Sequence, residues 1–182
     1  MPGLVDAYPG TFLPTEDISG SRKIIDPVHA VIHDGVHFTA NHYVSVGATT
    51  AVTVLIVPPG TATGQFIHLA AEFGANNSGV FQWCESPVTT GGTTLVSYNN
   101  DRASTNTDPV TLKHTVTVDA ASIGTVLQTI IVQGQATNQT KVGGGGKHDN
   151  EWILDPSKSY LVRFVADNAS TRVTVDLDYY YR

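Results

Sequence analysis

The sequence predicts an all-β protein, either an antiparallel β-sandwich or a barrel. Short segments in which apolar and polar side chains alternate recur along residues 25–182, and turn signals separate them about every eight to twelve residues. Charged residues make up only 14% of the chain, while Thr, Val, Gly, Asn and Ser are abundant. A composition with many β-branched and few long flexible side chains favours sheet over helix.

Size and charge narrow the class of protein further. The 182 residues fit one domain with a core of its own, and the net charge of −6 argues against nucleic-acid binding, which needs a basic face. The longest apolar run, residues 51–57, is too short to span a bilayer, and no signal-peptide pattern opens the chain. Cys84 is the single cysteine, so an internal disulfide and a thiolate metal cage are excluded. We therefore expect synthesis in a cytoplasm, with no membrane partner and no nucleic-acid partner.

Residues 1–24 differ from the rest of the chain. Met1-Pro-Gly, Tyr8-Pro-Gly and Leu13-Pro are turn or extended signals without periodicity. The segment is nevertheless too apolar for a solvated tail, which predicts an extended N-terminal arm that docks on a partner; a disordered leader is the alternative. The expected interface anchors of this arm are Leu4, Val5, Tyr8, Phe12 and Leu13.

The first half of the domain, residues 25–182, contains a series of expected strands. Residues 29–33 and 38–46 flank Asp34-Gly35, a turn signal. Residues 50–57 are almost all apolar, which is typical of a strand buried on both faces. Residues 65–73 and 80–85 follow, and in the second of these Phe81 and Trp83 share one face.

The second half is less regular. Residues 87–109 indicate a loop around a short strand at 94–98, and residues 111–118 alternate again. Residues 119–133 carry apolar side chains at helical spacing, but Gly124 and the β-branched run after it favour a strand that begins near Thr125. Residues 143–146 are four glycines and indicate a flexible loop.

The last two segments are expected to form a hairpin. Residues 160–165 and 171–182 are separated by Asp167-Asn168-Ala169-Ser170, a turn sequence, and Asp155-Pro156-Ser157 forms another turn before them. In the final segment the apolar side chains alternate with polar ones, which predicts a strand with one buried and one exposed face. Because the given sequence ends within this strand, we expect the strand to lie in the interior of a sheet. The residues expected to face the core are Val173, Val175, Leu177 and Tyr179.

Four histidines near the start of the domain are the strongest candidates for a site. A helix would align three of His29, His33, His37 and His42 and suggest a metal. Gly35 and the β-branched neighbours favour a strand instead, on which only His29 and His33 share a face. We therefore expect these histidines to be structural and the protein to hold no metal and no cofactor.

Other reactive groups are also better explained by structure. There is no Gly-x-Ser-x-Gly motif, and Cys84 lies in the middle of an expected strand, as a small buried side chain would. Asp176 and Asp178 share the solvent row of the last strand, where a calcium pair is the alternative to simple solvation. We therefore predict no catalytic residue.

Several stretches resemble a family of capsid decoration (cement) proteins from tailed bacteriophages. In the family's order they are HAVIHDGVHF at 29–38, LVSYNNDR at 95–102, GTVL at 124–127, the glycines at 143–146, NEWILDPSKSY at 150–160 and LDYYY at 177–181. Residues 1–24 fall outside the resemblance, and Tyr179-Tyr-Tyr-Arg182 replaces the family's tryptophan-tyrosine-glutamate ending.

The resemblance implies a single jelly-roll-like sandwich that sits on the exterior of a virion capsid, bound to the major capsid protein lattice and commonly a homotrimer. Such a protein would be synthesised in the cytoplasm of the bacterial host and would not be an enzyme. One alternative is a carbohydrate- or receptor-binding module of a phage fibre or tail, with Trp83, Tyr98, Trp152 or Tyr180 stacking on sugar rings. Another is a metal-dependent enzyme that uses His29, His33 and a distant carboxylate.

Overall fold

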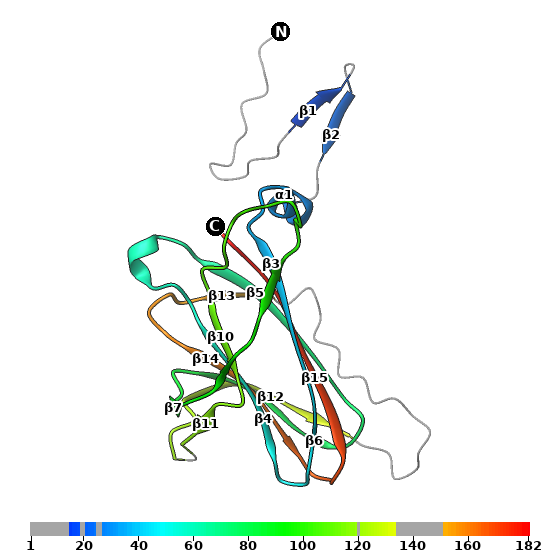
Figure 1. Cartoon of the computed structure of the whole chain (residues 1–182), viewed down its shortest axis with the longest axis vertical. Coiled ribbons are helices and arrows are strands. Elements are labelled where there is room, and N and C mark those ends of the chain that lie inside the picture. Colours follow the sequence, from blue (N-terminus) through cyan, green and yellow to red (C-terminus); the bar gives the residue numbers. More distant parts are fainter. Residues whose placement is uncertain (1–14, 19–20, 25–26, 120, 134–150) are drawn as a thin grey trace.

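The computed structural model describes residues 15–18, 21–24, 27–119, 121–133 and 151–182 (Figure 1). These residues form strands, one helix of seven residues and one 3-10 turn, as the composition predicted. The elements in chain order are β1 (Thr15–Ile18), β2 (Ser21–Ile24), α1 (Pro27–His33), β3 (His37–Val46), β4 (Ala51–Val57), η1 (Thr61–Thr63), β5 (Ile67–Ala75), β6 (Gly79–Glu85), β7 (Thr89–Thr90), β8 (Thr93–Thr94), β9 (Ser97–Asn99), β10 (Thr111–His114), β11 (Thr117–Val118), β12 (Thr125–Val132), β13 (Trp152–Leu154), β14 (Tyr160–Ala166) and β15 (Thr171–Tyr181).

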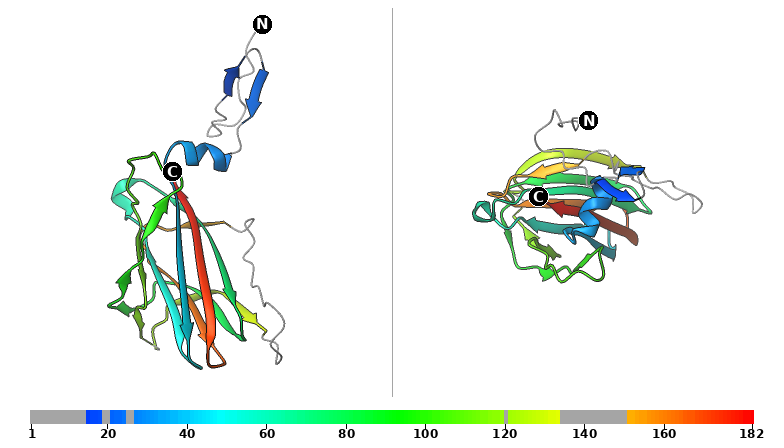
Figure 2. Two further views of the ribbon diagram at one scale, coloured as in Figure 1. Left: turned by 45° about the vertical axis from the view of Figure 1, so that its right-hand side comes forward. Right: turned by 90° about the horizontal axis from the view of Figure 1, so that it is seen from above.

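Two antiparallel sheets form the sandwich. The five-stranded sheet has the order β13-β5-β15-β3-β9, and the six-stranded sheet has the order β12-β6-β14-β4-β10-β8. Figure 2 shows β12 along one side of the sandwich and the green strands of residues 87–118 along the other. The last strand, β15, pairs with β3 and with β5, so it lies in the interior of its sheet as predicted.

The order of the strands is that of a jelly roll. From β3 to β6 each strand passes to the opposite sheet, and from β12 to β15 the same alternation is repeated. The only step within one sheet joins β6 to β12, which are antiparallel neighbours. Residues 86–124 leave the sandwich between these two strands and add β9 to one sheet and β8 and β10 to the other. The predicted jelly-roll-like sandwich is therefore confirmed.

The core between the sheets is built by the alternation that the sequence shows. Val173, Val175, Leu177 and Tyr179 of β15 are all buried, as expected. The rings of Phe73 and Phe81 stack across the two sheets with their centroids 3.8 Å apart. Each such side chain contributes about 1.5–3 kcal/mol when it is removed from water.

A second, smaller core covers the outer face of the six-stranded sheet. It consists of Leu55, Cys84, Val116 and Leu161, with Val116 supplied by the excursion of residues 86–124. Because this face is covered too, β4 is buried on both faces from Val52 to Ile56, as its apolar sequence predicted. The excursion is fastened to β4 by Thr53, whose hydroxyl donates to the Val116 carbonyl at 3.0 Å.

The expected hairpin of residues 160–182 is wrong. β14 pairs with β4 and β6, whereas β15 pairs with β3 and β5, so the two strands belong to opposite sheets. The turn between them is formed as predicted, and Ser170 adopts a positive φ of 59° there. It carries the chain across the sandwich rather than back along the same sheet.

The expected strand at residues 29–33 is also wrong, because Pro27–His33 is the helix α1. Proline fits the first position of a helix, where its missing N–H is not needed. Gly35, with φ 67°, ends the helix in the left-handed conformation that glycine adopts readily, and its N–H donates to the Ile32 carbonyl. Asp34 and Gly35 thus form a turn, but between a helix and a strand. Figure 1 shows α1 at the end of the sandwich where the C-terminus lies.

Two expected strands are interrupted. The strand predicted at residues 94–98 is divided into β8 and β9, and the one at 111–118 into β10 and β11. Thr115, with a positive φ of 56°, makes the second break. Within the expected arm, β1 and β2 form a two-stranded antiparallel ladder with each other. The expected anchors Leu4, Val5, Tyr8, Phe12 and Leu13 and the glycine loop at 143–146 lie outside the described residues.

Candidate functional site

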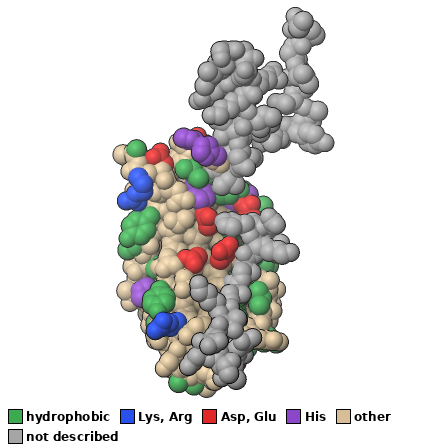
Figure 3. All heavy atoms as spheres, turned by 90° about the vertical axis from the view of Figure 1, so that its right-hand side faces the viewer, with side chains coloured by type: hydrophobic (Ala, Val, Ile, Leu, Met, Phe, Trp, Pro, Cys, Tyr) green, Lys and Arg blue, Asp and Glu red, His purple; other side chains and the backbone are tan. Residues whose placement is uncertain are grey.

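The outer face of the five-stranded sheet carries a group of polar side chains of the kinds that ligands recognise. The alternation that buries Val175 and Leu177 turns Thr174, Asp176, Asp178 and Tyr180 outward from β15. Register then sets their neighbours, because His37 of β3 and His68 of β5 both lie opposite Tyr180. Figure 3 shows acidic side chains gathered in the middle of this side of the molecule.

One row of this face is aromatic and runs across three strands. Tyr180 stacks on His68 with ring centroids 4.7 Å apart and on His37 at 6.2 Å. His68 Nδ1 lies 2.7 Å from Glu151 and His37 Nε2 lies 2.9 Å from Asp178. Burial, followed by a hydrogen bond to Glu151, raises the pKa of Tyr180 to about 12. This phenol therefore stays protonated at neutral pH and is not a base.

Below this row the face is hollowed. The row of Tyr98, Thr39, Asp178 and Ala70 crosses β9, β3, β15 and β5. Thr39 and Ala70 are small, so the surface is low between the larger side chains around them. The outer-face hollow has a volume of about 470 Å³, and its side chains include Thr39, Asn41, Ala70, Glu72, Tyr98, Asp176 and Asp178.

Three carboxylates and an amide line the outer-face hollow. Asp176 of β15 lies directly opposite Glu72 of β5, and Asp178 lies two residues further along β15. Asn41 donates a hydrogen bond from Nδ2 to Oδ1 of Asp176, which fixes both side chains.

An exposed tyrosine forms one wall of the hollow. Tyr98, from the short strand β9, is 57% exposed. The Arg102 guanidinium lies 5.5 Å from the centroid of its ring. Of the four aromatic residues proposed above as sugar-stacking groups, Tyr98 is the exposed one: Trp83 is buried, Trp152 packs on the core, and Tyr180 is held between two histidines.

The predicted histidine cluster is not brought together as one site. His29 and His33 lie one turn apart on α1, with their Nε2 atoms 3.0 Å apart. His37 lies in the aromatic row, and His42 points to the inner side of the five-stranded sheet, where it stacks on His114 at 4.4 Å. Within the residues that the structure describes, no group of three or more His, Cys, Asp or Glu side chains is placed to hold a metal ion.

Comparison of the chain with protein-family models, with curated proteins and with solved structures finds no match. The resemblance to phage decoration proteins therefore stays a prediction. Among the helical residues that the structure describes, none belongs to a helix that is long and apolar enough to cross a membrane.

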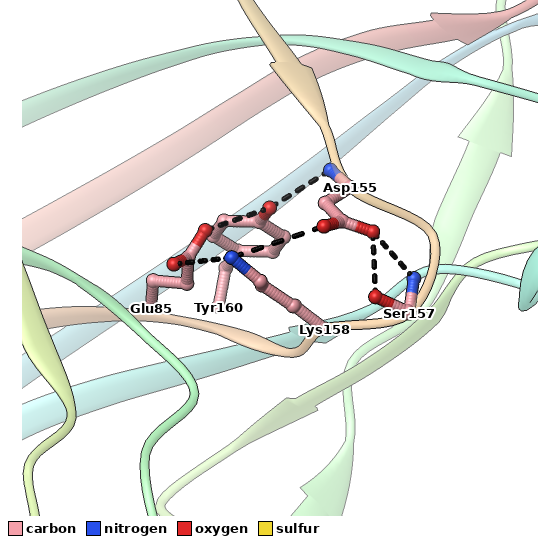
Figure 4. Close-up of polar contacts among 5 residues, drawn as sticks. All are labelled: Glu85, Asp155, Ser157, Lys158 and Tyr160. Atoms are coloured by element: carbon pink, nitrogen blue, oxygen red, sulfur yellow. Dashed lines mark hydrogen bonds and ion pairs between the residues drawn. The ribbon is translucent and has the colours of Figure 1, made fainter.

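A second polar cluster joins the turn before β14 to β6 (Figure 4). The Asp155 N–H donates to the Tyr160 hydroxyl at 2.8 Å, and that hydroxyl donates to Glu85 at 3.3 Å. The Lys158 ammonium donates to the other oxygen of Glu85 at 2.8 Å. Asp155 also accepts the N–H and hydroxyl of Ser157, which closes the predicted turn.

This turn cluster is structural rather than reactive. Burial raises the pKa of Tyr160, and the hydrogen bond to Glu85 raises the pKa of Lys158, so neither group is a base near neutral pH. Cys84 is fully buried as predicted, and burial raises the pKa of its thiol, which opposes thiolate formation.

Sequence reasoning missed an apolar edge on the side of the sandwich formed by β12 and β13, opposite to β8 and β9. The apolar edge consists of Val126, Leu127 and Ile131 of β12 together with Ile153 of β13, all of them exposed. β12 and β13 end their sheets on the same side, since Trp152 of β13 stacks on Trp83 of β6, the neighbour of β12. In the described part of the chain neither strand has a partner on its outer side. The signal was present in the sequence, where β-branched residues occupy both faces of 125–132.

Proposed function

We propose that this chain is a non-enzymatic virion structural protein that binds the outside of a bacteriophage capsid. It stabilises the shell by bridging neighbouring major capsid proteins. It acts as a homotrimer on the capsid exterior, after synthesis in the cytoplasm of the bacterial host. The resemblance of residues 25–182 to decoration proteins motivates the proposal, and the apolar edge is the observation that carries it.

The apolar edge has the properties of a binding surface. Ile131 is 73% exposed and Ile153 is 63% exposed, although both belong to strands that elsewhere bury such residues. Exposed apolar side chains on a strand without an outer partner mark a place where another chain docks, and in the described part of the chain β12 and β13 have no strand on their outer sides. A protein that acts in this way depends on a few anchors spread over an interface.

The N-terminal segment supplies a second contact in this proposal. Its anchors, Leu4, Val5, Tyr8, Phe12 and Leu13, are set among prolines, so they cannot form a helix or close a core alone. An extended arm of this kind binds in a preformed groove on a neighbouring subunit or on the capsid lattice. The jelly roll supports the proposal only as a compatible scaffold, because a fold does not determine a function.

The test is quantitative incorporation into particles. Wild-type protein is expected in many copies per purified virion, whereas a fibre or vertex component would be present in few. Ile131→Lys places a charge on the apolar edge and is expected to reduce the copy number. Val96→Lys is the matched control, since Val96 is 59% exposed between β8 and β9 at the opposite edge of the sandwich.

Both variants must first be shown to fold, by circular dichroism and by their melting temperatures. Absence of the wild-type protein from virions would refute the proposal. Normal incorporation of Ile131→Lys would refute the role of the apolar edge.

A further inference from the structure

We infer that the outer-face hollow binds a neutral saccharide. The inference goes beyond the proposed function, because binding to a capsid does not require it. Pockets of about 300–1,000 Å³ with a few convergent polar groups are the usual binding sites for small molecules. The outer-face hollow has such a size, and it combines one exposed aromatic ring with carboxylate, amide and hydroxyl groups on neighbouring strands.

The aromatic wall matches the apolar face of a sugar ring. Tyr98 is not part of the core, since more than half of the residue is exposed beside the hollow. The main chain of Tyr98 is fixed by its pairing with Thr39 of β3, and Arg102 lies over the ring. The ring is therefore held in place before a ligand arrives, which limits the entropy lost on binding.

The polar wall matches hydroxyl groups. Carboxylate oxygens accept strong hydrogen bonds from hydroxyls. The bond from Asn41 uses one oxygen of Asp176, and His37 contacts one oxygen of Asp178, so both carboxylates are oriented by protein partners. Each retains a second oxygen. These groups stand on paired strands rather than on loops, which gives a binding site precise geometry.

Charge selects among the possible ligands. Asp176 and Asp178 place carboxylates in the hollow, which disfavour phosphate, sulfate and sialic acid groups. A ligand rich in hydroxyl groups provides donors to facing carboxylates without adding a charge. Hence the class of ligand is a neutral oligosaccharide.

The hollow and the apolar edge lie on different strands. Tyr98 belongs to β9, at one end of the five-stranded sheet, and the hollow extends from there to Ala70 and Glu72 of β5, which pairs with β13 at the other end. A copy that is held through β12 therefore keeps Tyr98, at the far end of the sheet, away from the contact. On a virion this would place a weak sugar-binding site on each copy, and many copies would raise the avidity for a glycan-covered surface.

The test is titration of the full chain with cellotriose, maltotriose and chitotriose. Binding is measured by isothermal titration calorimetry and by the NMR chemical shifts of labelled protein. At least one trisaccharide is expected to bind saturably and to shift resonances of β3, β9 and β15. Tyr98→Ala is expected to weaken that binding about tenfold or more. Asp176→Asn is expected to weaken it as well.

Tyr43→Ala is the matched control, because Tyr43 is 60% exposed on the same face of β3 but does not line the hollow. This variant is expected to bind like the wild type. Absence of binding to all three trisaccharides, or unchanged binding by Tyr98→Ala, overturns the inference. Saturable binding of calcium alone that is lost in Asp176→Asn would assign the hollow to a cation instead and would also overturn it.

Discussion

The hydroxyl of Tyr179 donates a hydrogen bond to the carboxylate of Asp108. Tyr179 is buried in the last strand, whereas Asp108 lies in the excursion that leaves the sandwich between β6 and β12. The same carboxylate accepts the Ser97 hydroxyl and the Val110 N–H. One acidic group thus joins the excursion to the centre of the five-stranded sheet, and burial followed by the Asp108 charge raises the pKa of Tyr179.

Tyr179→Phe is therefore expected to destabilise the protein. A hydrogen bond to a charged group contributes about 1.5–3 kcal/mol, and the variant removes only the hydroxyl. Urea denaturation measures the change. Tyr181→Phe is the control, since both rings stack on Phe38 at similar distances, but Tyr181 is partly exposed. A change within about 0.5 kcal/mol is expected for the control, and equal changes for both variants would contradict the assignment.

Gly124 is expected to be essential for the start of β12. It has φ 85°, and a Cβ atom there would lie 2.1 Å from the Glu85 carbonyl oxygen. Gly91, with φ 68°, would place a Cβ in open space. Gly91→Ala should cost only the backbone strain of about 1–2 kcal/mol, and Gly124→Ala should cost more. Thermal denaturation of the two variants gives the comparison; a smaller loss for Gly124→Ala would show that the close contact is relieved without cost.

Because of His42, the free energy of unfolding is expected to decrease as the pH is lowered below about 6.5. Burial, and then the neighbouring His114, lower the pKa of His42 in the folded chain below that of the unfolded chain, about 6.5. The unfolded chain then binds more protons, so the free energy of unfolding decreases as the pH falls from the unfolded pKa through the folded one. His42→Gln should flatten this dependence, measured by urea denaturation between pH 7 and pH 5. His114→Gln should reduce it in part. An unchanged slope for His42→Gln would place the pH dependence elsewhere.

Chelation of metal is expected to leave the melting temperature unchanged. His29 and His33 contact each other on α1, but a metal that is coupled to folding would need further ligands and would contribute folding free energy directly. Differential scanning calorimetry with and without EDTA makes the measurement. A large decrease with EDTA, reversed by zinc, would indicate a metal site.

Deletion of residues 1–24 is expected to leave the sandwich folded. Burial of each anchor contributes about 1.5–3 kcal/mol, while each ordered residue costs about 1–2 kcal/mol, so the arm becomes ordered only where its prolines have already stiffened it and a preformed groove buries its anchors. The melting temperature should therefore hardly change, while incorporation into capsids should weaken. Unfolding of the truncated chain would make the arm a part of the core. Normal incorporation would make it only a leader.

The sequence was sufficient where burial alone decides the structure. The alternation in 171–181 predicted which face of β15 is buried, and the apolar run at 51–57 predicted a strand covered on both faces. Both follow from the local pattern of apolar and polar side chains. Gly124 also located the start of β12 correctly, because the β-branched residues after it outweigh their helical spacing.

The sequence was not sufficient where pairing decides. A turn such as residues 167–170 reverses the chain, but the same pattern fits a hairpin and a crossing to the opposite sheet, so β14 and β15 were wrongly paired. α1 was missed because its β-branched residues outweighed Pro27 and Gly35, which mark its two ends. The outer-face hollow depends on the register of four strands, and neither Tyr98 nor Asp176 carries that information locally.

The central position of β15 also affects how the protein is made. Its two neighbours, β3 and β5, are translated about a hundred residues before it, and they do not pair with each other. Until residues 171–181 leave the ribosome, each of these strands has an open edge along its whole length. The five-stranded sheet must therefore be completed after nearly all of the domain has been synthesised. A premature stop before Thr171 yields a chain with two unpaired strand edges, which are prone to aggregation.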